Sequence, residues 1–344
     1  MPGSALRIAL LGTAHIHLAD HLTVLAAQRG AAAGAGLCAV HHGRSPGEGR
    51  LAGAVAEALR GVPVAPSAAE ALAGADAALV CSTTAEHGPL LAAIAAAGLP
   101  ALVEKPLATT GAATAALLRL TGRTANPAVP AMFLRRAPSL RRARTLLTAG
   151  RIGELRFAEA WFCHGGLPAG SFTGTAAWML DPRRGGTGAF ADLGIHLLDL
   201  LRWLRPRAAI TVHAARLRPL RGGRVGLDEG GTAELDWGGV PVALRTDWAA
   251  APGGPAGGVG IGLRLRGSRG SVTVRGGSLL LATAHGVHAE RHAEPAAGHA
   301  LSAFLASLRG RTCWQAPTAR DILASAHALD RIAEVAGVQA GAGH

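Results

Sequence analysis

The stretch RIALLGTAHIHLADH, residues 7–21, decides the first part of the fold. Its apolar run, residues 8–11, reads as a buried strand, Gly12 follows at once, and Leu18, Leu22 and Leu25 then recur at helical spacing. A strand, a glycine turn and a helix in this order are typical of the phosphate-binding start of a dinucleotide-binding domain. The three histidines and the aspartate in the same stretch could instead hold a metal ion.

The composition is that of an ordinary globular protein. A chain of 344 residues with 49% hydrophobic residues is long enough for two domains with separate cores. The uncharged run 88–103 is too short to span a bilayer and is broken by Gly98 and Pro100, and the first residues do not resemble a signal peptide. The four cysteines lie far apart without a C-x-x-C pair, which argues against a zinc knuckle or a disulfide framework. We expect a cytoplasmic protein with no membrane partner.

The charge balance raises the question of a nucleic-acid partner. The net charge is +12 and the isoelectric point is about 11.4. The arginines are scattered along the chain, however, and aromatic residues make up only 3% of it, so few side chains could stack on bases. We therefore expect no nucleic-acid partner, and we expect the positive charge to attract anionic ligands such as dinucleotide phosphates.

The most informative single residue is Lys105. The chain has 34 basic residues, and Lys105 is the one lysine among them, while tyrosine is absent. A partly buried ammonium can release its proton whereas a guanidinium stays charged, so a lysine that persists where arginine is otherwise used indicates a site that arginine cannot fill. Chance survival on the surface is the alternative.

The pattern of strands and helices predicts an α/β protein of two domains. Strands that alternate with helices over residues 1–125 indicate a Rossmann dinucleotide-binding domain, whose ligands bind at the carboxyl ends of the strands. Residues 126–336 indicate an α+β domain with a mainly antiparallel open sheet, and residues 337–344 a frayed tail. The predicted strands are 6–11, 37–41, 77–81, 101–103, 155–162, 209–217, 232–237, 241–248, 259–266, 270–274 and 278–283. The predicted helices are 17–29, 51–60, 67–73, 85–97, 138–149, 189–204, 299–309 and 318–336.

A second group of polar side chains lies in GGTGAFADLGIHLLDLLRWL, residues 185–204. On a helix, Asp192, His196 and Asp199 share one face. A histidine between carboxylates suits general acid/base chemistry near neutral pH. A buried histidine satisfied by its helix neighbours, or a metal site, would give the same pattern.

The motifs VEKPLA (103–108) and DPRRGGTGAFADLGIHLLDLLRWL (181–204), with STTAEHGPLLAAIAAAGLPALVEKPLA (82–108) before them, resemble the Gfo/Idh/MocA family. The resemblance extends over nearly the whole chain. It implies an NAD(P)-dependent oxidoreductase that transfers a hydride between the nicotinamide and a carbinol or ketone carbon of a sugar, cyclitol or related polyhydroxy compound. Lys105 matches the family's catalytic lysine, His196 its acid/base and Asp192 the carboxylate that orients substrate and histidine. The absence of tyrosine separately excludes the short-chain dehydrogenases and the aldo-keto reductases, which protonate through a tyrosine hydroxyl.

The resemblance also assigns binding residues. In the fingerprint G-x-G-x-x-G/A, Gly12, Ala14 and His17 take the three glycine positions, so only the first glycine is kept. Thr83 stands where the family usually has proline. The expected cofactor contacts are Gly12, Thr13, Ala14, His15, Ile16, His41, Arg44, Ser82, Thr83, His87, Glu104 and Lys105. The expected substrate contacts are Trp178, Asp192 and His196.

Cofactor choice and partners complete the expectations. The end of the predicted second strand carries His41, His42, Arg44 and Ser45 and no acidic residue, which favours NADP(H), with NAD(H) possible. We expect no metal ion at His15 and His17, because the H-x-H opening of barrel amidohydrolases belongs to a fold of eight β/α units that this chain lacks. The expected partners are a small polyhydroxy substrate and a second copy bound through the C-terminal sheet. An NAD-dependent glycosidase of the same fold and a non-catalytic nucleotide-binding protein remain as alternatives.

Overall fold

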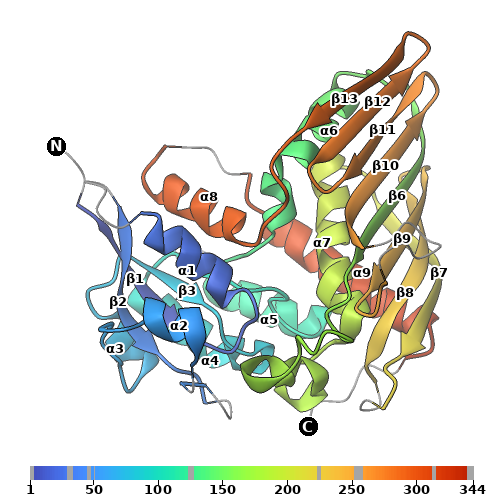
Figure 1. Cartoon of the computed structure of the whole chain (residues 1–344). Helices are drawn as coiled ribbons and strands as arrows, with labels where there is room; N and C mark the ends of the chain where they lie inside the picture. Colours follow the sequence, from blue (N-terminus) through green and yellow to red (C-terminus); the bar gives the residue numbers. More distant parts are fainter. Residues whose placement is uncertain are drawn as a thin grey trace. The chain divides into compact units, whose positions relative to one another are not determined.

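The computed structural model describes residues 4–28, 34–44, 48–49, 51–122, 128–222, 226–251, 259–311 and 315–338. The chain forms two compact units (Figure 1). Unit 1 consists of residues 1–131, 172–186 and 297–316, and unit 2 of residues 132–171, 187–296 and 317–344. The units therefore differ from the two continuous domains expected from the sequence, because two later segments return to unit 1.

Unit 1 contains a sheet of five parallel strands in the order β2-β1-β3-β4-β5. The chain leaves β1 toward one side for β2 and toward the other for β3, so the topological switch point lies between β1 and β3. Strand β3 and the last four residues of β1 are fully buried, as expected when helices cover both faces of a parallel sheet. The strands are β1 (Leu6–Leu11), β2 (Ala35–His41), β3 (Ala77–Val80), β4 (Ala101–Val103) and β5 (Ala128–Pro130).

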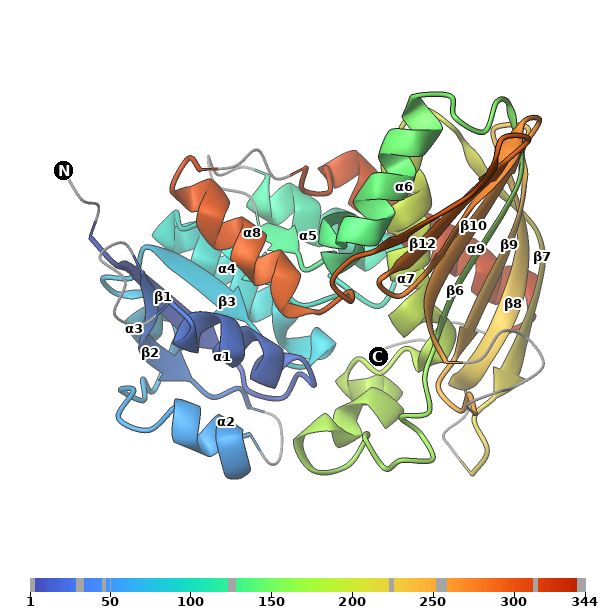
Figure 2. The same ribbon diagram turned by 45° about the horizontal axis from the view of Figure 1, so that its top comes forward.

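Most helices of unit 1 connect these strands. They are α1 (Leu18–Ala26), α2 (Gly53–Ala58), α3 (Ala68–Leu72), α4 (His87–Ala97) and α5 (Gly111–Thr121), with the 3₁₀ turns η1 (Thr84–Glu86), η3 (Gly174–Leu180) and η4 (Pro182–Arg184). Helix α8 (Gly298–Leu308) lies beside α1, as Figures 1 and 2 both show. A side chain at Gly298 would meet the Val24 methyl at 2.7 Å and the Asp20 carbonyl at 3.1 Å, so the glycine allows this close approach.

Unit 2 contains an eight-stranded sheet in the order β13-β12-β11-β10-β6-β9-β8-β7. Every neighbouring pair is antiparallel except β6 and β9, so the expected mainly antiparallel sheet is confirmed. Helices α6, α7 and α9 contact this sheet, and α7 packs on the neighbouring strands β6, β9 and β8. The strands are β6 (Leu155–Cys163), β7 (Ile210–Pro219), β8 (Asp228–Trp237), β9 (Pro241–Asp247), β10 (Gly260–Gly267), β11 (Gly270–Arg275), β12 (Ser278–Thr283) and β13 (Gly286–Arg291). The helices are α6 (Pro138–Thr148), α7 (Gly188–Leu204) and α9 (Ala319–Val335), preceded by the 3₁₀ turn η2 (Phe133–Arg136).

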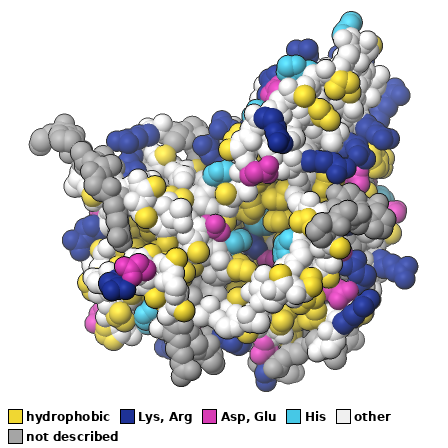
Figure 3. Space-filling model, in the orientation of Figure 1, with side chains coloured by type: hydrophobic (Ala, Val, Ile, Leu, Met, Phe, Trp, Pro, Cys, Tyr) yellow, Lys and Arg dark blue, Asp and Glu magenta, His cyan; other side chains and the backbone are white. Residues whose placement is uncertain are grey.

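The sequence located most of these elements within a few residues of their observed bounds, but it did not predict α5, β5 and β13. The Pro/Gly-rich stretch 249–258, whose composition indicates a surface loop, and the predicted tail 337–344 fall mostly on residues outside the described ranges. Ser45 and Cys313 also lie outside them. Lys and Arg side chains occupy many separate places on the face shown in Figure 3. Within the described ranges, no helix is both long enough and apolar enough to cross a bilayer.

Candidate active site

The turn after β1 is held rigidly at the switch point of the sheet. Gly12 has a φ of +81°, and a side chain there would overlap Ser82, whose backbone nitrogen would lie 2.6 Å away. The amides of Ala14 and His15 both donate to the Cys81 carbonyl, at 3.0 and 2.9 Å. The first fingerprint glycine is therefore required by the close approach of β3, and the turn is fixed before any ligand binds.

The other two fingerprint positions are filled without disturbing this turn. Ala14 is buried, and its carbonyl accepts the indole N–H of Trp178 at 3.0 Å. His17 stands at the N-cap of α1, and its ring reaches the Glu104 carboxylate. Ile16, between them, is a large hydrophobic side chain that remains 38% exposed at the start of the helix.

Glu48, which the sequence patterns did not single out, contacts the turn after β1. Its Oε2 accepts the amide of Thr13 at 2.7 Å and that of Gly43 at 2.8 Å, so an acidic side chain does lie over the turn at the end of β2. Burial raises the pKa of Glu86, whose carboxylate accepts the Arg44 amide, and the negative charge of Glu48 raises it further. In the sequence, Glu48 is the glutamate of GRSPGEG (residues 43–49). It lies in the loop after the second strand and not at the last residue of that strand, where an acidic residue was sought.

Residues at the end of β3 connect the strand to the Lys105 segment. Ser82 and Thr83 are buried, and the Ser82 hydroxyl donates to the Thr83 carbonyl. His87 opens α4, and its Nδ1 donates to the Leu107 carbonyl at 3.0 Å. Burial lowers the pKa of His87 to about 4, so this ring is neutral at physiological pH. Its observed contact holds the segment that follows Lys105. His41 likewise bonds through Nδ1 to the Ala65 carbonyl.

Lys105 and Glu104 follow β4 directly and are both buried. The Lys105 amide donates to Glu104 Oε2 at 3.2 Å. Three histidines surround the same carboxylate: His21 Nε2 lies 2.6 Å from Oε1, and the Nδ1 atoms of His17 and His15 lie 3.3 and 3.6 Å from Oε2. Burial alone would raise the pKa of Glu104, but the adjacent His15 and His17 hold it well below its usual value.

Trp178 belongs to unit 1, although the sequence analysis placed it in the second domain as a substrate contact. It lies in η3, is almost fully buried, and uses its indole N–H on the turn after β1. Its ring centroid is 5.9 Å from that of His15. The contacts observed for Trp178 therefore support the glycine-poor turn.

In unit 2, helix α7 carries Asp192 and His196, both buried. The indole N–H of Trp248 donates to Asp192 Oδ2 at 3.0 Å, which fixes that carboxylate. The His196 ring packs against Phe133 and Phe162, with centroids 4.8 and 5.8 Å away. The imidazole thus has aromatic side chains around it and one turn of helix between it and a carboxylate.

Asp199, the second carboxylate expected beside His196, has a different role. It accepts two hydrogen bonds from Arg135, at 2.7 and 2.6 Å, deep in unit 2. Asp321 at the start of α9 joins this group through Arg135 and Arg202, each at 3.3 Å. The four side chains tie α7 to η2 and α9, and Asp199 is therefore a structural residue that anchors the helix of His196.

Comparison with known proteins agrees with this architecture. The family model described as "Oxidoreductase family, NAD-binding Rossmann fold" matches residues 6–129, and that described as "GFO/IDH/MocA C-terminal domain" matches residues 140–273. An inositol dehydrogenase homolog from Azotobacter vinelandii, solved with NAD+, has the same fold, with a TM-score of 0.78 at 18% identity over 98% of this chain and 96% of that chain.

Two curated relatives are similar over shorter stretches. Inositol 2-dehydrogenase 2 of Saccharopolyspora erythraea is 32% identical over 198 residues, which is 57% of this chain and 53% of the relative. Myo-inositol dehydrogenase Hyg17 of Streptomyces leeuwenhoekii is 32% identical over 161 residues, 46% of each. The chain thus spans about half the length of the curated relatives it matches. Because the models of both domains come from one family, the chain belongs to the GFO/IDH/MocA family.

Proposed function

We propose that this chain is an NAD(P)-dependent oxidoreductase acting on a CH–OH group of a cyclitol, a sugar or a related polyhydroxy compound. The observation that carries the proposal is Lys105, the one lysine of the chain, buried directly after β4 at the carboxyl edge of a parallel sheet. Ligands of such sheets bind at this edge. Two curated relatives are named as inositol dehydrogenases, which supports a cyclitol as the first substrate to test.

The residues of unit 1 fit a dinucleotide. Gly12 leaves no side chain in the turn at the switch point, and α1 begins directly behind it, so that its first amides face the place where a pyrophosphate is expected. The missing second and third glycines do not argue against this, because Ala14 is buried and the His17 ring is paired with Glu104. When bound, the nicotinamide supplies the hydride acceptor or donor.

Glu48 changes the expected cofactor preference. The sequence favoured NADP(H) because no acidic residue ends β2, but the structure brings the Glu48 carboxylate onto the amides of Thr13 and Gly43. Glu86 lies close enough to this carboxylate for its pKa to be raised by it. Two acidic groups at the end of β2 disfavour a 2′-phosphate and suit ribose hydroxyls. We therefore propose NAD(H) as the preferred cofactor, with Glu48 accepting from the ribose.

The proposed chemistry needs a proton to leave the substrate hydroxyl as the hydride leaves its carbon. We assign the proton to His196, whose ring is held between Phe133 and Phe162, and the orientation of the substrate to Asp192, which Trp248 holds in place. Lys105 would stabilise the oxygen as its charge changes. Its backbone amide and the buried Glu104 carboxylate fix the chain at this position.

The test is the variant Lys105→Ala, assayed with NAD+ and NADP+ against a panel of polyols that begins with myo-inositol. We expect turnover to fall by at least about 100-fold, because positioned acid/base groups contribute that much or more. NADH binding, followed by fluorescence, should stay close to that of the parent. The exposed Arg151→Ala serves as the control for loss of one positive charge and should change neither quantity.

Other outcomes would overturn the proposal. Unchanged turnover in Lys105→Ala would remove the catalytic assignment, and failure of the parent to bind either dinucleotide would favour a non-catalytic protein. Cleavage of a glycoside that requires bound NAD+ without net reduction would identify the glycosidase alternative.

The cofactor preference has its own test. Glu48→Gln keeps the shape of the side chain but removes its charge, and we expect the ratio of NADP+ to NAD+ affinity to rise about 10-fold, since hydrogen bonds to charged groups contribute about 1.5–3 kcal/mol. An unchanged ratio would contradict the role of Glu48.

A further inference from the structure

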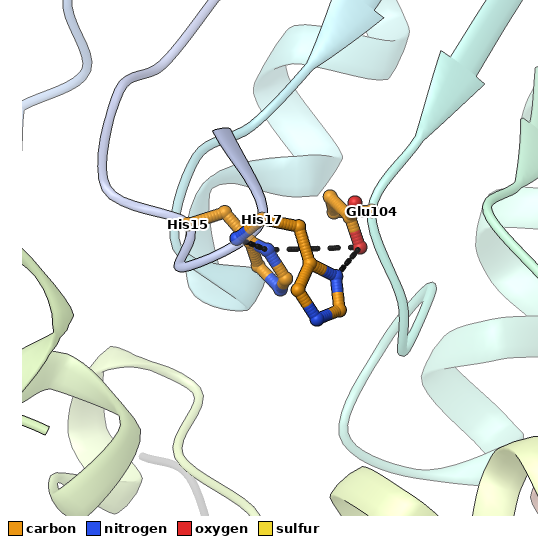
Figure 4. A group of neighbouring side chains, drawn as sticks. All are labelled: His15, His17 and Glu104. Atoms are coloured by element: carbon orange, nitrogen blue, oxygen red, sulfur yellow. Dashed lines mark hydrogen bonds and ion pairs between the residues drawn. The ribbon is translucent and has the colours of Figure 1, made fainter. Parts of the chain in front are cut away.

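From the cluster drawn in Figure 4, we propose that His15, His17 and Glu104 form a binding site for a divalent first-row transition metal ion. One ligand atom from each residue lies within 4.8 Å of the others. No metal was expected at His15 and His17, because the H-x-H opening of barrel amidohydrolases belongs to a fold of eight β/α units. The fold supplies a third ligand from a position 87 residues after His17.

The chemistry of the three ligands favours such an ion. Two imidazoles and one carboxylate are the ligand set of many zinc and non-haem iron sites, which keep further positions open for water or substrate. Metal–ligand bonds of about 2.0–2.2 Å place neighbouring ligand atoms about 3–3.5 Å apart. The distance of 3.3 Å from Glu104 Oε2 to His17 Nδ1 lies in this range, and the distance of 3.6 Å to His15 Nδ1 is slightly longer.

Surrounding groups hold the carboxylate in position. His21, fully buried on α1, bonds to the other oxygen of Glu104 at 2.6 Å, and the Lys105 amide bonds to Oε2. Outer partners of this kind orient ligands and contribute strongly to metal affinity. The His17 side chain is 22% exposed while those of His15 and Glu104 are almost fully buried, so an ion would enter past His17.

The proposal goes beyond the proposed function and can be tested without any nucleotide. The chain is stripped with a chelator, dialysed and titrated with Zn²⁺ by calorimetry, and separately with Co²⁺, whose visible absorption reports on coordination by nitrogen and oxygen. We expect one equivalent of each ion to bind and Zn²⁺ to raise the unfolding temperature. His17→Ala should weaken binding by more than about 100-fold, since outer-shell changes alone cost about 10–100-fold.

The matched control is His213→Ala, an exposed histidine on β7, which should bind like the parent. Glu104→Gln is the second variant and should lose the Co²⁺ spectrum while keeping a side chain of the same shape. The proposal is overturned if the parent binds no ion, or if His17→Ala and His213→Ala bind equally well, because the cluster is then an ion-pair network alone. Nucleotide binding measured in chelator tests the proposed function separately.

Discussion

Replacement of Arg135 by methionine tests what holds α7, and with it His196, in place. The Arg135 side chain is 3% exposed and makes two hydrogen bonds to Asp199, whose side chain is 2% exposed, and one to Asp321. Methionine fills much of the same volume but leaves the Asp199 carboxylate buried without those bonds. Removal of one partner from a buried ion pair costs about 3–5 kcal/mol. Asp321 keeps Arg202 and the amide of Thr318, so the loss falls mainly on Asp199.

Urea unfolding followed by tryptophan fluorescence measures this cost. Four of the six tryptophans, Trp161, Trp203, Trp237 and Trp248, belong to unit 2, so tryptophan fluorescence reports mainly on the unit that contains the ion pair. We expect Arg135→Met to lower the free energy of unfolding of unit 2 by about 3–5 kcal/mol. In the double variant Arg135→Met/Asp199→Leu neither charge remains, and most of the lost stability should return, because apolar replacements of buried pairs are often neutral.

The double variant separates the explanations. A single variant that loses less than about 1 kcal/mol would mean that Asp199 finds another partner or that water reaches it. A double variant less stable than the single one would mean that Arg135 acts through packing and not through its charge. Either result would refute the assignment of Asp199 as a carboxylate that depends on Arg135.

Two further predictions concern the helix and the turn that carry the site. Asp228 accepts the Phe190 amide at the start of α7, and burial raises the pKa of Asp228 to about 7. Because the folded protein holds this proton more tightly than the unfolded chain, the free energy of unfolding is highest below about pH 4. It falls by up to about 4 kcal/mol as the pH rises to about 7. Asp228→Asn should remove this pH dependence from unfolding curves recorded between pH 4 and 8, and a parent whose stability does not fall over that range would contradict the assignment. Gly12→Ala combines a positive φ with overlap on Ser82 and should cost more than about 3 kcal/mol, whereas Gly98→Ala, with φ +66° and open space, should cost about 1–2 kcal/mol. Equal melting temperatures for the two variants would show that the overlap at Gly12 is relieved.

Local patterns were enough to locate most elements. Thr318 and Asp321, three residues apart, form a reciprocal capping box at the start of α9. Ser67 caps α3 by accepting the Glu70 amide, although the Glu70 carboxylate takes the serine hydroxyl and not a backbone donor. These features depend on residues three apart, so the sequence displays them directly. Strand β5 has three residues, pairs with β4 and ends in Pro130, and a proline in so short a run argues against a strand.

Contacts between distant residues were not predictable in the same way. Trp178 bonds to Ala14 across 164 positions, and Glu104 meets His21 across 83, yet neither pair shows any pattern in the chain. Glu48 was overlooked because it lies in the loop after β2, and only the fold brings its carboxylate back to the amides of Thr13 and Gly43. The residue types were visible in each case, whereas their partners were decided by the order of strands in the sheet.

The glycine-poor turn is better explained as a specialised turn than as an eroded one. An eroded fingerprint would leave the larger side chains without a defined place, and the tight turn would lose its support. Here Ala14 is buried under Trp178, His17 caps α1 and pairs with Glu104, and the amides of Ala14 and His15 remain on the Cys81 carbonyl. The glycine that is kept, Gly12, is the one whose replacement the backbone of Ser82 forbids. Each substitution therefore has a compensating contact, and the contacts of His15 and His17 converge on the carboxylate that precedes Lys105.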